Sequence, residues 1–126
     1  HCLSSAASDV YKRQLMRTGA DVDQMTQVET LDNILNLQYY FELKRYPYLM
    51  YHTISDAEIK NPDIKLLYSK VNQKRFFRSE SSHIDFVLEN ALTISKDDPH
   101  PNTEGHERWA TMLREYIDDN NLRTFQ

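Results

Sequence analysis

The residues best suited to chemistry lie in one stretch near the C-terminus, where positions 97–106 read DDPHPNTEGH. Asp97 precedes His100 by three residues, on a turn stiffened by two prolines. This spacing can place a carboxylate oxygen at Nδ1 of the imidazole, which fixes the tautomer and leaves Nε2 available as a base. Asp98 is an alternative acid, although only one residue separates it from His100. We therefore expect Asp97 and His100 to serve acyl-transfer chemistry.

Two simpler interpretations of this stretch remain open. Asp97 can act as a local capping group with His100 at the surface, or Asp97, His100 and His106 can converge on a metal ion. Two histidines and a carboxylate can bind zinc, but this spacing across a helix start matches no strong metal motif. We expect no metal and no cofactor, and we expect His106 to pack near the start of a helix.

The same residues carry a resemblance to a known family. The pattern D-x-x-H-P-x-x-x-G, followed by His106 and Trp109-Ala110, resembles the last conserved block of SGNH (GDSL-type) hydrolases. The resemblance implies that Asp97 is the acid and His100 the base of a Ser-His-Asp triad. It also implies that Pro101 and Gly105 shape the turn. It covers roughly residues 26–121, and its specific part is 97–110.

The chain departs from the family pattern elsewhere. It has no Gly-Asp-Ser motif for the nucleophile and neither of the blocks that supply oxyanion-hole groups, and Ser79, Ser81 and Ser82 match no family motif. The resemblance therefore implies a fragment of a serine hydrolase that supplies the triad Asp and His and is inactive alone. The intact parent would cleave a small-molecule or glycan ester, such as an O-acyl group on a carbohydrate or lipid. The alternative is a non-catalytic α/β interaction or structural module.

Composition excludes several other classes. The chain has 126 residues, a net charge of −4, one cysteine and two glycines. An acidic chain is a poor nucleic-acid binder, and no stretch is long and apolar enough for a membrane span. One cysteine allows no intrachain disulfide, and two glycines allow no glycine-rich phosphate loop. No signal peptide is visible, and the compartment stays unknown.

Periodicity predicts the elements that position the loop. Helices are expected at 26–45 with a Thr26–Glu29 capping box, from Pro62, at 83–90, and from Asn102 or Thr103 onward. Short apolar runs at 48–54 and 75–79 predict two strands, and 92–105 predicts a loop. Alternation of helices and strands implies a parallel sheet covered by helices.

These elements give the predicted domain organisation. Residues 1–14 read as a non-native, adaptor-like or disordered leader, 15–25 as a loop, and 15–126 as a partial SGNH hydrolase-like domain. The expected fold class is α/β, the C-terminal part of a flavodoxin-like parallel-sheet sandwich, truncated and helix-rich. Two strands are too few for a complete sheet, so we expect the parent protein to extend further toward its N-terminus.

Overall fold

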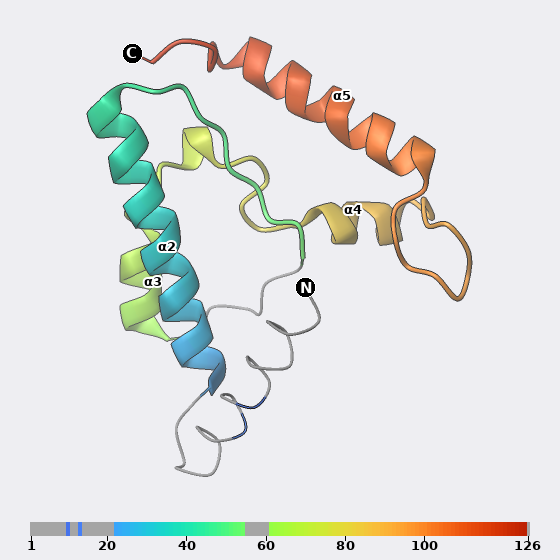
Figure 1. The fold of residues 1–126 in the computed structure, drawn as a ribbon, viewed down its shortest axis with the longest axis horizontal. Helices are drawn as coiled ribbons and strands as arrows, with labels where there is room; N and C mark the ends of the chain where they lie inside the picture. Colours follow the sequence, from blue (N-terminus) through green and yellow to red (C-terminus); the bar gives the residue numbers. More distant parts are fainter. Residues whose placement is uncertain (1–9, 11–12, 14–21, 55–60, 126) are drawn as a thin grey trace.

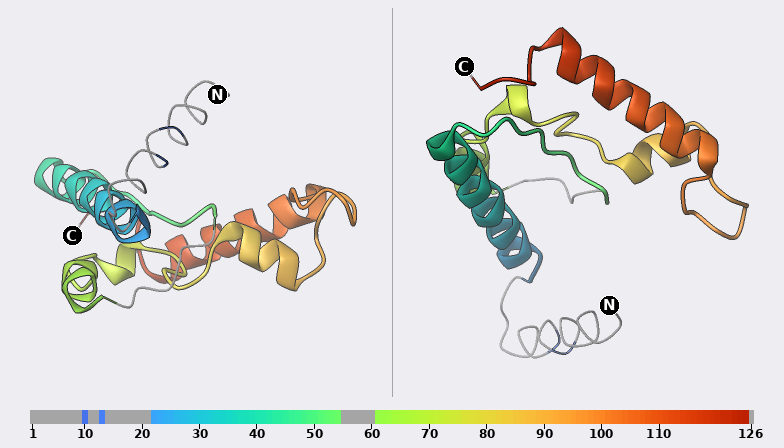
Figure 2. Two further views of the ribbon diagram at one scale, coloured as in Figure 1. Left: turned by 90° about the horizontal axis from the view of Figure 1, so that it is seen from below. Right: turned by 45° about the horizontal axis from the view of Figure 1, so that its top comes forward.

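The computed structural model describes residues 10, 13, 22–54 and 61–125. Its elements are α2 (Val22–Lys44), α3 (Pro62–Tyr68), the 3₁₀ helix η1 (Gln73–Arg75), α4 (His83–Glu89) and α5 (Thr103–Asp119). Figure 1 shows α2 beside α3 at one end of the molecule and α4 with α5 at the other. Extended connections join the two ends, and Figure 2 shows the same arrangement from two further directions. The predicted leader, apart from Val10 and Arg13, and the predicted loop at 55–56 lie outside the described residues.

The predicted parallel sheet is wrong. The described residues contain no strand, and the expected strands at 48–54 and 75–79 meet only at isolated bridges. Met50 pairs in parallel with Phe76, and His52 pairs in parallel with Ser82. Extension stops after Phe77 because Arg78 adopts a left-handed φ of 48°, which turns the chain away before a second pair can form beside the first. The α/β flavodoxin-like class is therefore replaced by a helical fold with two parallel contacts.

The helices follow local signals closely. Pro62 occupies the first turn of α3, and the Asn61 side chain accepts hydrogen bonds from two backbone N–H groups there. Ser82 and Asp85 form a capping box at α4, and the Asn102 side chain accepts from Gly105 N at α5. These three predicted helices are confirmed.

The first helix is confirmed at its end but not at its start. Arg45 has φ 57°, and the Tyr46 N–H bonds back to Phe41 O at 2.8 Å, which closes α2 just before Pro47 as expected. The helix begins at Val22 and not at Thr26. Residues 22–25 contain no glycine or proline, so the helix continues through them and Thr26 is not its cap.

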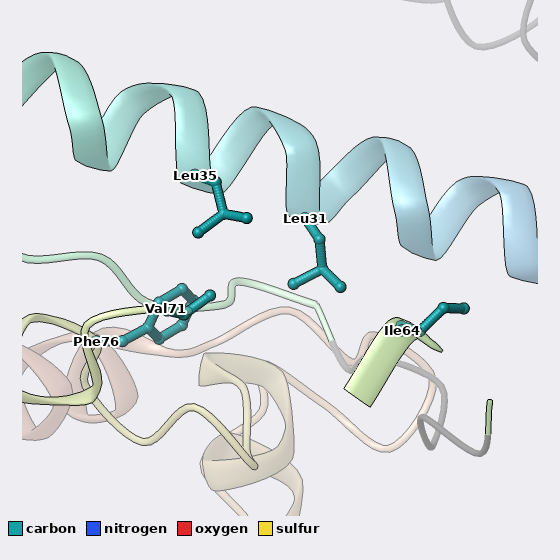
Figure 3. Packing of buried hydrophobic residues seen from close by; sticks show 5 residues of the cluster. All are labelled: Leu31, Leu35, Ile64, Val71 and Phe76. Atoms are coloured by element: carbon teal, nitrogen blue, oxygen red, sulfur yellow. The ribbon is translucent and has the colours of Figure 1, made fainter. Parts of the chain in front are cut away.

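The first apolar cluster joins α2 to α3. Leu31 and Leu35 of α2 point toward Ile64 of α3, and Val71 and Phe76 close the cluster (Figure 3). Gln38 is only 4% exposed, and its amide fixes the same contact, since it donates to Lys70 O and accepts from Asn72 N. Its polar atoms are thereby satisfied inside the interface.

The second apolar cluster lies under α5. Trp109 packs with Phe77, Phe86, Val87 and Leu92. Phe76 and Phe77 belong to different clusters because neighbouring side chains on extended backbone point in opposite directions. The segment that contains Phe76 and Phe77 therefore packs against both clusters and links the two ends of the molecule.

Candidate functional site

The loop with the predicted site residues leaves α4 and returns to α5. Its two ends are fixed by an antiparallel bridge between Thr93 and Pro101 and by the bond from Ile94 N to His100 O at 2.9 Å. Asn102 strengthens this closure, because its N–H donates to Leu92 O and its side-chain amide donates to Thr93 O. His100 therefore stands at the closed base of the loop and not at its tip.

Gly105 lets the start of α5 lie against the base of this loop. A Cβ at this position would lie 3.0 Å from the carbonyl oxygen of Leu92 and 3.3 Å from its Cβ. A larger residue would push α5 away from the backbone that supports His100. Gly105 is thus needed for close approach, and it lies in the first turn of α5 and not in the loop before it.

The carboxylate that holds His100 belongs to Asp98. Nδ1 of His100 lies 2.6 Å from Oδ1 of Asp98, and the same oxygen accepts from the His100 backbone N–H at 3.1 Å. The ring hydrogen bond, followed by the backbone one, lowers the pKa of Asp98 below its ordinary value. Both side chains face solvent, with exposed fractions of 78% for His100 and 43% for Asp98. The carboxylate fixes the ring, and no described residue bonds to Nε2.

Asp97, the carboxylate predicted from the D-x-x-H spacing, has a different place. It is exposed, and the structure does not bring it to the His100 ring. The Ser95 backbone and hydroxyl bind the Asp98 N–H and so fix the local turn. An aspartate two residues before His100 reaches both its ring and its N–H from this turn.

His100 borders a hollow of about 390 Å³ between the loop and the start of α4. Two further imidazoles, those of His83 and His106, line it, and the remaining lining residues are Thr53, Ile54, Ile84, Pro99 and Pro101. The hollow lies directly beyond the bridge between His52 and Ser82, at the carboxyl ends of both paired segments. Ligands of parallel sheets bind at this kind of position.

His83 is held at the edge of this hollow by aromatic contacts. Its ring stacks on Trp109 at 4.8 Å and lies 5.5 Å from the ring of His106. Burial and then the nearby His106 lower the pKa of His83 below 6.5. Its Nε2 is buried without a hydrogen-bond partner among the described residues. His83 is therefore held in its uncharged form near neutral pH.

The metal alternative receives no support in the described part of the chain. Among these residues no group of three His, Cys, Asp or Glu side chains converges as a metal site requires.

No described helix is long and apolar enough to cross a membrane.

The sequence singled out His100 but not His83, which lines the same hollow. His83 follows a turn far from the 97–106 stretch, and no local spacing links the two histidines. Contacts with Trp109 and His106 bring His83 beside the start of α5, and the bridge between His52 and Ser82 brings residues 53 and 54 to the same place. The available signal was the predicted helix start at 83, whose first residues face the hollow.

Comparisons with known proteins give no further guide to this geometry. No protein-family model, curated protein or solved structure matches the chain.

Proposed function

We propose that residues 97–106 supply the acid–base part of an SGNH-type serine hydrolase that cleaves an ester or O-acyl bond. The observation that supports the proposal most directly is the 2.6 Å contact between a carboxylate and Nδ1 of His100, a residue that lines a hollow. The nucleophilic serine would belong to a longer parent chain. The proposal rests on this loop and its hollow, and it needs no sheet in the described residues.

In the proposed reaction His100 acts twice. Its Nε2 accepts the proton of the serine hydroxyl as the oxygen attacks the ester carbon, and the resulting imidazolium then protonates the departing alkoxide. A carboxylate at Nδ1 keeps the ring in the tautomer with Nε2 unprotonated and stabilises the imidazolium. A histidine packed away from any hollow would instead favour the non-catalytic module.

The identity of the orienting carboxylate is tested with the chain as it stands. Nitrogen-15 NMR of the imidazoles reports which ring nitrogen of His100 carries the proton. Asp98→Asn should weaken the preference for the Nδ1–H tautomer, because the amide is a poorer acceptor than the carboxylate. Asp97→Asn is the matched control and should leave the tautomer unchanged. The opposite pattern would make Asp97 the acid, as the family resemblance implies.

The catalytic role requires a longer gene product that hydrolyses esters. There, His100→Ala should lower kcat by about four to six orders of magnitude, as loss of a triad member does. Lys96→Ala, an exposed change in the same loop, should leave kcat within about twofold. Near-normal activity of the His100 variant, or a parent with no nucleophilic serine, would refute the proposed function.

A further inference from the structure

The chemistry of the hollow beside His100 indicates what it binds. Four of its lining residues are apolar, namely Ile54, Ile84, Pro99 and Pro101. Among the described lining residues there is no carboxylate, amide, lysine or arginine, and Thr53 is the only one with a hydroxyl. Apolar walls with a few polar groups at one side are typical of sites for apolar ligand groups.

The imidazoles do not make this hollow strongly polar. Stacking on Trp109 covers one face of the His83 ring, and burial favours its uncharged form. His100 is occupied at Nδ1 by Asp98. The polar atoms that this hollow offers a sugar are few, namely Nε2 of His100, Nε2 of His83 and the Thr53 hydroxyl, so a sugar ring would gain few partners for the water it displaces.

We propose that this hollow holds an apolar acyl chain of several carbons, so that the ester carbon of the substrate lies beside His100. This inference rests on the proposed function and names the substrate class for the same site. It selects an acyl chain, and not a sugar ring, as the part of the substrate that enters the hollow. Its volume of about 390 Å³ lies in the range of small-ligand sites.

The test measures binding of neutral esters to the full 126-residue chain. Methyl hexanoate and methyl acetate share the ester group and differ by four methylenes, and methyl glucoside represents a sugar. Fluorescence of Trp109, the only tryptophan, and NMR signals of His83 and His106 report occupancy. Each buried methylene is worth about fourfold in affinity, so two buried methylenes predict about fifteenfold tighter binding of methyl hexanoate than of methyl acetate.

Two exposed isoleucines provide matched variants. Ile54 is 75% exposed and lines the hollow, whereas Ile94 is 60% exposed and does not line it. Ile54→Ser should weaken methyl hexanoate binding by about threefold or more, and Ile94→Ser should change it by less than about twofold. Equal losses in both variants, equal affinity for the two esters, or preferential binding of methyl glucoside would overturn the proposal.

These binding results are independent of catalysis. Ester binding to the hollow needs no nucleophile, so an inactive parent would refute the proposed hydrolase and leave the measured affinities unchanged. Equal affinities for the two esters would refute the acyl-chain proposal and leave the triad test with His100→Ala unaffected.

Discussion

Replacement of Arg75 by methionine should cause a large loss of stability, because this side chain ties the C-terminal tail to the rest of the fold. Arg75 is 7% exposed, and its guanidinium donates to three backbone carbonyl oxygens, those of Tyr48, Leu122 and Thr124. It also lies over the rings of Tyr48 and Phe125 at 5.2 Å. One side chain therefore joins the segment after α2, the 3₁₀ helix η1 and the tail after α5.

The expected magnitude follows from these contacts. Methionine keeps an unbranched stem of similar bulk but has no donor, so the bonds to Tyr48 O and Leu122 O, both buried, are lost. Each buried acceptor left without a donor costs about 1–3 kcal/mol, and the cation–π contacts add about 0.5–1 kcal/mol each. Release of a buried charge offsets part of this cost. We expect the free energy of unfolding to decrease by about 2–4 kcal/mol.

Urea unfolding of the full chain measures this loss. Trp109 fluorescence and far-ultraviolet circular dichroism follow the transition, and amide exchange at 122–125 should accelerate in the variant. The control is Arg108→Met, because Arg108 is exposed and, within the described part of the chain, its side chain bonds only to Glu104 one helical turn away. That pair is worth about 0.3–0.5 kcal/mol. If Arg75→Met were no more destabilising than Arg108→Met, the anchoring role of Arg75 would be refuted.

Three further predictions concern the segments around the hollow. Ala91 holds a left-handed φ of 52°, so Ala91→Gly should raise the free energy of unfolding by about 1 kcal/mol in urea titrations, and a loss would contradict the strain argument. Asn102→Ala removes the cap of α5 and should cost about 1 kcal/mol, whereas an unchanged urea midpoint would show that water replaces the cap. Because the pKa of His83 is lowered below 6.5, the unfolded chain binds its proton more readily, and stability should fall as pH drops below about 6.5. His83→Gln should flatten this dependence between about pH 7.5 and about pH 5, and an equal slope would assign it to other groups.

The helices could be predicted because their signals are local. Asn61, Ser82 and Asn102 each accept hydrogen bonds from backbone N–H groups within a few residues, and Pro62 and Asn102 stand at the helix starts where they were expected. The strands could not be predicted in this way, since a strand forms only where a second extended segment runs beside it. Phe76 is extended, but the left-handed Arg78 bends the chain after one paired residue. Nothing in the alternation of apolar residues at 75–79 reports that bend.

The candidate site shows the same difference between local signals and contacts made at long range. Spacing alone indicated a carboxylate for His100, but it did not distinguish Asp97 from Asp98, because the choice depends on the turn that Ser95 fixes. The predicted helix at 83–90 did not indicate that its first residue would line the same hollow as His100. That placement depends on contacts of His83 with Trp109 and His106, which lie far along the chain and which no local pattern encodes.

The location of the hollow shows how a site of this kind forms without a sheet. Two backbone bonds fix its inner side, from His83 N to His52 O at 2.9 Å and from Ile84 N to Thr53 O at 3.2 Å. They hold the end of one extended segment against the first turn of α4, and the closed loop then brings His100 to the same point. A parallel sheet creates the same convergence by placing the carboxyl ends of its strands along one edge. Here a single bridge and a short helix bring Ile54 and Ile84 to the hollow beside His100 without the sheet that the sequence led us to expect.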